Sequence, residues 1–152
     1  LVGFGWAKPV PVNGYALKRK NPAALLYVAL AGPLSNFLLA ALAAIPLRFG
    51  WIAPTISKSI FLPTLFDFFS YFLFLNLGLM LFNLLPIPPL DGEEILDFVL
   101  PEKLAYSYEQ LRPYGSYILL GLIVIGQISG FDLLGLILTP AMTGMAKFLL
   151  GA

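Results

Sequence analysis

The chain alternates between long apolar stretches and short segments that carry most of its charge. Three apolar stretches, residues 23–47, 63–85 and 114–131, are long enough to cross the ~30 Å hydrocarbon core of a bilayer as helices. A fourth, residues 133–150, is interrupted by Pro140 and fits a half-helix, an interfacial segment or the partner of a hairpin. The pattern therefore predicts an all-α polytopic membrane protein with about three transmembrane helices, organised as a single membrane domain.

The segment before the first apolar stretch, residues 1–22, contains an Asn13-Gly14 pair, which is typical of a hairpin turn. Two prolines spaced two positions apart place their missing donors along one edge of an extended strand. The donors of Val10 and Val12 then stay available for pairing along the other edge. We therefore predict a short β-hairpin or re-entrant loop, with a turn anchored by aromatic residues at the membrane surface as the alternative.

Three prolines follow the second apolar stretch and open the segment 86–113. Because proline removes a backbone donor and disfavours helix in the residue before it, the second helix should end near Leu85 and continue as an extended stretch. Asp91 comes directly after this stretch and begins an acidic run that precedes an amphipathic helical pattern. Asp91 and Glu94 have the spacing of an acidic capping box, so Asp91 is predicted to cap that helix, to bind a cation, or to do both.

The composition excludes several classes of function. Of 152 residues, 59% are hydrophobic and 11% are charged, whereas soluble domains carry about a quarter charged residues. The lipid bilayer is therefore the expected environment, and a net charge of +1 offers no basic surface that would bind a nucleic acid. Cysteine and histidine are both absent, which removes thiol nucleophiles, imidazole bases and the commonest zinc ligands from this chain. Its chemistry must use carboxylates, hydroxyls and amides.

The distribution of lysine and arginine predicts the orientation of the chain in the membrane. Four basic residues precede the first helix and two lie within residues 91–113, whereas the loop between the first two helices holds only Arg48 and Lys58. This count of six against two places the N-terminal segment and residues 91–113 together on the cytoplasmic side.

Polar groups at membrane depth are costly, so those in or beside the apolar stretches are candidates for function. They are Asn36, Asn76, Asn83, Asp67, Asp91 and Asp132. Shortly before Asn36, the pair Gly32-Pro33 permits close approach of another helix and frees a backbone carbonyl. Packing alone also explains this pair, with Asn36 as a hydrogen-bonding contact between helices.

Three segments, in this order and with this spacing, resemble the site-2 protease family of zinc intramembrane metalloproteases. They are Gly5-Trp6-Ala7-Lys8-Pro9-Val10-Pro11-Val12-Asn13, Gly32-Pro33-x-x-Asn36, and Asn83 through Asp91-Gly92. They are similar to the Pro-Val-Pro loop, the Gly-Pro-x-x-Asn helix and the Leu-Asp-Gly motif of the short bacterial subgroup, which lacks a PDZ domain. The loop from Arg48 to Leu62 is too short to hold such a domain.

The resemblance implies a protease that hydrolyses peptide bonds of transmembrane or membrane-proximal protein substrates in the bacterial plasma membrane. It implies zinc as the cofactor, with Asp91 as the third ligand and Asn83 in the lining of the active site. The substrate-binding positions that it implies are Gly32, Pro33, Asn36, Val10 and Val12.

The family's His-Glu-x-x-His signature supplies two zinc ligands and the general base, and it is missing because this chain has no histidine. The family places that helix upstream of the Pro-Val-Pro loop, and this chain begins at Leu1, close to the loop. We therefore expect the chain to be the C-terminal part of the protease, inactive alone and with its remaining zinc ligands upstream.

Other classes of protein would use the same polar residues differently. A transporter or channel fragment would build an ion site from the broken helix and from Asp67, Asp91 or Asp132, but the inverted repeats expected of that class are not visible. Paired aspartates would suggest an intramembrane aspartyl protease, but Asp132 lacks the Gly-x-Gly-Asp pattern of those enzymes. A non-catalytic membrane subunit is the third alternative.

Overall fold

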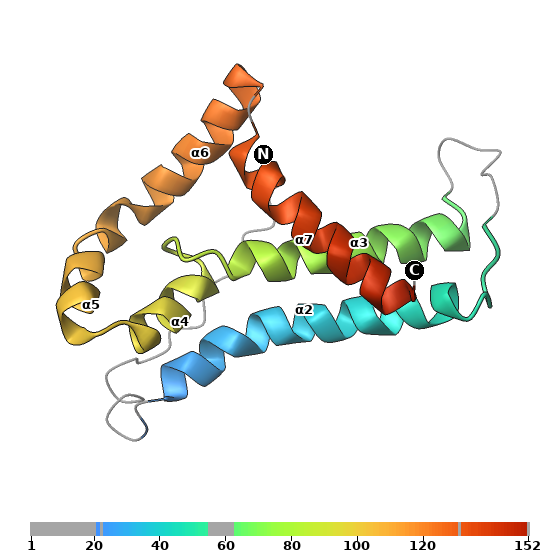
Figure 1. Ribbon diagram of the computed structural model, residues 1–152, viewed down its shortest axis with the longest axis horizontal. Helices are drawn as coiled ribbons and strands as arrows, with labels where there is room; N and C mark the ends of the chain where they lie inside the picture. Colours follow the sequence, from blue (N-terminus) through green and yellow to red (C-terminus); the bar gives the residue numbers. More distant parts are fainter. Residues whose placement is uncertain (1–20, 22, 55–62, 131, 152) are drawn as a thin grey trace, which may run out of the picture.

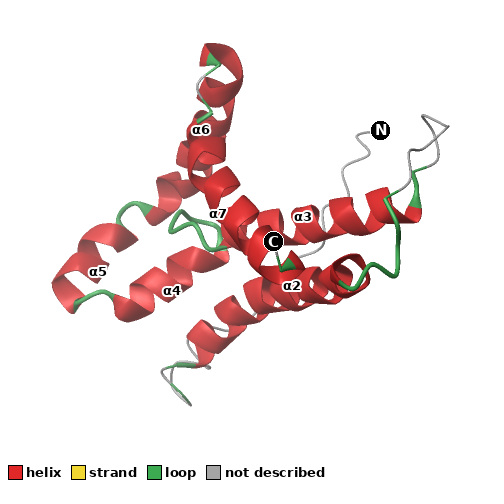
Figure 2. Cartoon of the chain, turned by 45° about the vertical axis from the view of Figure 1, so that its right-hand side comes forward, coloured by secondary structure: helices red, strands yellow, loops and turns green. Residues whose placement is uncertain are grey.

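The computed structural model describes residues 21, 23–54, 63–130 and 132–151, and all regular structure in that part of the chain is helical. The elements are α2 (Ala24–Arg48), α3 (Leu65–Asn83), α4 (Asp91–Val99), α5 (Glu102–Glu109), the 3-10 helix η1 (Arg112–Tyr114), α6 (Gly115–Ser129) and α7 (Leu133–Leu150), as Figure 1 shows. Only helices and loops occur in the described part (Figure 2), which confirms the predicted all-α class. The predicted hairpin, with Val10 and Val12, lies outside the described residues.

Four helical segments of the described part are long and apolar enough to cross a membrane, which supports a polytopic membrane protein. They are Ala24–Arg48, Leu65–Asn83, Lys103–Ser129 and Leu133–Leu150. The sequence predicted about three spans and left the form of residues 133–150 open. In the structure this stretch is α7, a continuous helix of 18 residues that contains Pro140 without ending there.

The core lies between α2 and α3, which run antiparallel to each other (Figure 1). The contact face of α2 is made of small residues, of which Ala40, Ala43 and Ala44 are at most 3% exposed. Against them α3 places Leu73 and Leu77, which are both fully buried. Small side chains on one helix let two backbones approach closely, which is how membrane helices gain packing energy where water does not drive them together.

The C-terminus of α7 lies beside the C-terminus of α2. Nη1 of Arg48 donates a hydrogen bond to the carbonyl oxygen of Leu149 at 3.2 Å, and a cation there offsets the partial negative charge of the helix end. Further along α7, Met142 packs against Gly78 of α3. In contrast, α6 leans away from the α2–α3 pair (Figure 1), and Gly115 is its one buried residue.

Candidate functional site

The site that the sequence predicted is assembled where α2 begins and α3 ends. The chain leaves α3 at Leu84 and turns back to begin α4 at Asp91, and α4 then packs against α2. The intervening proline segment was predicted to be extended, and that prediction is wrong. The segment is folded into tight turns, because the amides of Ile87 and Leu90 donate to the carbonyls of Leu85 and Ile87 at 2.8 and 2.9 Å.

Asp91 does not cap α4, which corrects the predicted capping box. The N-cap is Leu90, whose carbonyl accepts from the amide of Glu93 at 3.1 Å, and no side chain makes a cap hydrogen bond there. Asp91 is therefore the first helical residue, where its negative charge is favourable to the helix dipole but its carboxylate is not required by the backbone. The carboxylate is left available for another partner.

The carboxylate of Asp91 lies against the backbone of α2 at Gly32. A Cβ atom at position 32 would stand 2.7 Å from Oδ2 of Asp91, closer than two such atoms can approach. The glycine of the Gly-Pro motif therefore makes room for the aspartate of the Leu-Asp-Gly motif. This contact joins two motifs that the sequence presents far apart, and Pro33 beside it is buried within α2.

Gly92 is a functional position that the sequence reasoning missed. A Cβ atom there would collide with the carbonyl oxygens of Leu84 and Leu85, so only glycine lets the first turn of α4 sit directly on the end of α3. Gly92 is buried, and it fixes how close Asp91 lies to the α2–α3 pair. The signal for this role was the glycine that immediately follows the aspartate.

The electrostatics of the site follow from its partial burial. Asp91 is half-buried, and desolvation raises the pKa of its carboxyl above the ordinary value. Burial also raises the pKa of Glu93 two residues on, where the guanidinium of Arg112 opposes the rise. A desolvated carboxylate without a charged partner is stabilised by a cation. Within the described part of the chain, no group of three or more acidic side chains gathers to hold a metal, so this region offers a single anionic ligand.

Of the other predicted site residues, Val10 and Val12 lie outside the described part of the chain, and within that part neither Asn36 nor Asn83 is hydrogen-bonded to Asp91. Asn36 is one turn beyond Gly32 on the same face of α2 and is half-buried. Asn83 is the last residue of α3 and is also half-buried. The structure thus brings Gly32 and Asp91 together, with Asn36 on the helix that carries Gly32 and Asn83 at the end of the helix that precedes Asp91.

The remaining polar candidates have local structural roles. Asp67 closes a capping box with Thr64 at the start of α3, where its Oδ2 accepts from the Thr64 amide at 3.0 Å. Asp132 caps α7 by accepting from the amide of Gly135 at 2.8 Å. The side chain of Asn76 donates to the carbonyl of Phe72 at 2.8 Å within α3. Among the described residues, Asp67, Asp91 and Asp132 do not converge, so nothing here supports the transporter interpretation.

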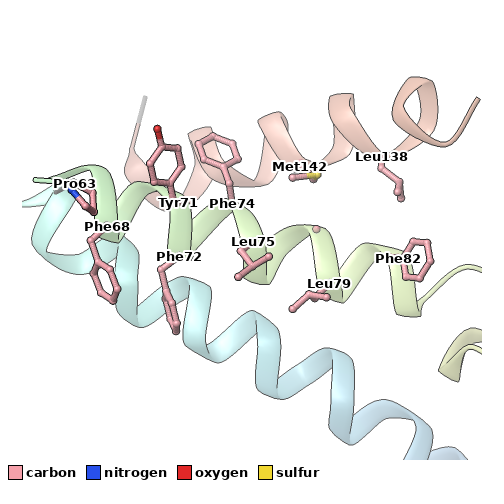
Figure 3. A pocket seen from close by; sticks show the side chains of 11 residues that line it. Pro63, Phe68, Tyr71, Phe72, Phe74, Leu75, Leu79, Phe82, Leu138 and Met142 are labelled. Atoms are coloured by element: carbon pink, nitrogen blue, oxygen red, sulfur yellow. The ribbon is translucent and has the colours of Figure 1, made fainter. Parts of the chain in front are cut away.

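An apolar groove of about 780 Å³ lies along α3 and α7 (Figure 3), and Asp91 is not among its lining residues. Its lining is dominated by aromatic and aliphatic side chains: Pro63, Phe68, Tyr71, Phe72, Phe74, Leu75, Gly78, Leu79, Phe82, Leu138 and Met142. None of these residues is a candidate for catalysis or metal binding. The groove therefore supplies no group for peptide hydrolysis.

Comparison with known proteins agrees with the resemblance carried by the motifs. Residues 50–125 match the family model of Peptidase family M50. Over 124 residues the chain is 40% identical to the protein named "Putative zinc metalloprotease YwhC" from Bacillus subtilis (strain 168), and the aligned stretch covers 82% of this chain and 56% of that protein. The chain thus spans about half the length of this curated relative. No solved structure matches the chain.

Proposed function

Because the chain belongs to peptidase family M50, the family of the site-2 proteases, we propose that it forms the C-terminal part of a zinc-dependent intramembrane protease. The substrates of this protease are transmembrane or membrane-proximal segments of other proteins. The protease belongs to the short subgroup without a PDZ domain and lies in the bacterial plasma membrane. The family match, the printed name of the bacterial relative and the four candidate membrane spans support this proposal.

One observation carries the proposal: Asp91 holds a desolvated carboxylate against Gly32 instead of capping α4. A carboxylate oxygen is an established zinc ligand, and the partial burial of Asp91 with no cationic partner among the described residues favours the binding of a metal there. Asp91 is therefore the zinc ligand that this chain contributes. The other ligands and the general base come from the His-Glu-x-x-His helix of the complete protease. A bound zinc ion supplies Lewis-acid chemistry and a water nucleophile at neutral pH.

The other residues of the chain prepare the substrate. A peptide bond within a transmembrane helix is already hydrogen-bonded by its own helix, so a protease must unwind the helix and shelter the freed backbone groups from lipid. Gly32, Pro33 and Asn36 line the α2 side of the aspartate, and Asn83 lines the α3 side. The backbone of Val10 and Val12 pairs with the unwound substrate as an added strand, which gives affinity with little sequence preference.

Substitution of Asp91 tests the proposal in the natural full-length protein. Asp91→Asn and Asp91→Ala should both lose bound zinc and substrate cleavage, since neither side chain is an anionic ligand. Because Asp91 is not an N-cap, the two variants should differ little in stability, by less than the ~1 kcal/mol typical of a lost cap. Zinc content of the detergent-purified protein and cleavage of a membrane substrate measure the first effect, and thermal unfolding measures the second.

Asp132 offers a matched control, because it is an aspartate that does cap a helix. Asp132→Ala should destabilise α7 by ~1 kcal/mol and leave zinc content unchanged, whereas Asp132→Asn should preserve both. An Asp91→Asn protein that keeps stoichiometric zinc and normal cleavage would refute the assignment of the ligand.

A further inference from the structure

A single arginine lies against three acidic side chains of α4. Nε of Arg112, in η1, pairs with Oε1 of Glu93, and its Nη2 lies 3.2 Å from Oε1 of Glu94 and 3.9 Å from Oδ2 of Asp97. Glu93 is only 8% exposed, and α4 buries no residues other than Gly92 and Glu93. The most buried side chain of α4, that of Glu93, is therefore held by an ion pair, while α4 as a whole packs against α2.

This arginine acts on a face of α4 adjacent to the one that carries the candidate ligand. At 3.6 residues per turn, Glu93 lies about 200° around the helix from Asp91, whereas Glu94 lies only about 60° from it. Arg112 therefore holds one side of α4 while the carboxylate of Asp91 meets Gly32 on the side next to it. A helix of nine residues has little stability of its own, so its rotation about its axis is determined by such tertiary contacts.

The segment that carries Arg112 is itself fixed to the proline turns that precede α4. The hydroxyl of Tyr108, at the end of α5, donates to the carbonyl of Pro86 at 3.0 Å. After the arginine, Gly115 is buried against Pro88 so closely that a Cβ atom there would collide with it. The chain is thus in contact with the proline turns both before and after Arg112, and these contacts fix the position of Arg112 relative to the start of α4.

We propose that Arg112 is a positioning residue: by gripping Glu93 and Glu94 it sets the rotation of α4, and so the direction in which Asp91 presents its carboxylate to zinc. The inference rests on the proposed role of Asp91 as a ligand. The planar guanidinium engages two carboxylates at once through Nε and Nη2, which a lysine ammonium cannot reproduce with the same geometry.

The test measures the metal site rather than catalysis alone. In the natural full-length protein, zinc affinity is determined by competition with a chelating dye, and the visible absorption spectrum of the Co²⁺-substituted protein reports the coordination geometry. Arg112→Gln should weaken zinc binding by at most about 10- to 100-fold, the range that follows the loss of a group bonded directly to a ligand, and should change the cobalt spectrum. Arg112→Lys should give an intermediate affinity, because lysine keeps the positive charge but lacks the planar guanidinium that contacts two carboxylates at once.

Lys103 provides the matched control, since it is an exposed basic residue of α5. Lys103→Gln removes the same charge and should leave affinity and spectrum as in the wild type. The double variant Glu93→Gln/Arg112→Gln removes both ends of the ion pair, and its zinc affinity should fall no further than that of Arg112→Gln alone. This variant also decides the question if Arg112→Gln fails to fold, because it leaves no unpaired buried charge.

The outcomes separate the inference from the proposal on which it rests. Wild-type zinc affinity and cobalt spectrum in a folded Arg112→Gln or double variant overturn the positioning role, while loss of zinc in Asp91→Asn would leave the ligand assignment standing. Retention of zinc in Asp91→Asn overturns both. A shifted spectrum that Arg112→Lys partly restores supports the positioning role, since a general loss of stability would not produce a graded change in coordination geometry.

Discussion

The α2–α3 pair and the junction at α4 are held together by different means. Between α2 and α3, alanines pack against fully buried leucines along several helical turns, so many similar contacts share the energy. At the junction, α4 packs against α2, and its position is fixed by close approaches at Gly32 and Gly92 and by the ion pairs of Arg112. The pair therefore provides stability, whereas the junction determines where one carboxylate lies. Losses at the pair should appear as unfolding, and losses at the junction should appear as a displaced Asp91.

The largest effect on stability is expected in the core of the helix pair. Leu77→Ala removes a fully buried side chain and should destabilise the protein by ~2–5 kcal/mol, because the alanine face opposite cannot move in to fill the cavity. Zinc affinity of the protein that remains folded should stay unchanged. Thermal unfolding in detergent, followed by circular dichroism, measures the loss. Leu75→Ala is the control, since Leu75 is 60% exposed on the same helix and its truncation leaves no internal cavity.

A smaller loss of stability but a greater effect on the site is expected at Gly92. Gly92→Ala forces a methyl group onto the carbonyls of Leu84 and Leu85, which belong to the backbone and cannot rotate away. We expect ~1–3 kcal/mol of destabilisation together with loss of zinc, because α4 must move away from the end of α3. Gly121→Ala in α6 is the control, since nothing lies within 4 Å of the added atom and alanine favours helix there. Equal zinc content in both variants would contradict the importance of this contact.

The smallest effect on stability, and the sharpest test of the contact between motifs, is expected at Gly32. The added methyl group of Gly32→Ala meets only the end of the Asp91 side chain, which can turn away. Stability should therefore change by less than ~1 kcal/mol, whereas zinc affinity should fall because the carboxylate is displaced. Gly144→Ala in α7, where nothing lies within 4 Å, should leave both quantities close to those of the wild type. Unaltered zinc affinity in Gly32→Ala would show that the contact between Gly32 and Asp91 does not matter for zinc binding.

The sequence by itself determined the elements and the family. Apolar runs of membrane-spanning length predicted helices over residues 23–47 and 63–85, and the structure has α2 and α3 at Ala24–Arg48 and Leu65–Asn83. Such predictions succeed because an apolar segment of that length in a bilayer must satisfy its backbone internally as a helix. The order of the three motifs also identified the site-2 protease family, since each motif is local in the chain.

Only the tertiary structure decided what Asp91 does. Its spacing to Glu94 predicted a cap, but the N-cap is Leu90 and α4 begins at Asp91 itself, and the carboxylate lies against Gly32. The sequence also did not predict the proline turns, the close contact of Gly92 with the end of α3, or the ion pairs of Arg112 with α4. These features depend on contacts between segments that are distant along the chain. Local propensity gives each segment its secondary structure, but which atoms meet across α2, α3 and α4 is decided by how their surfaces pack.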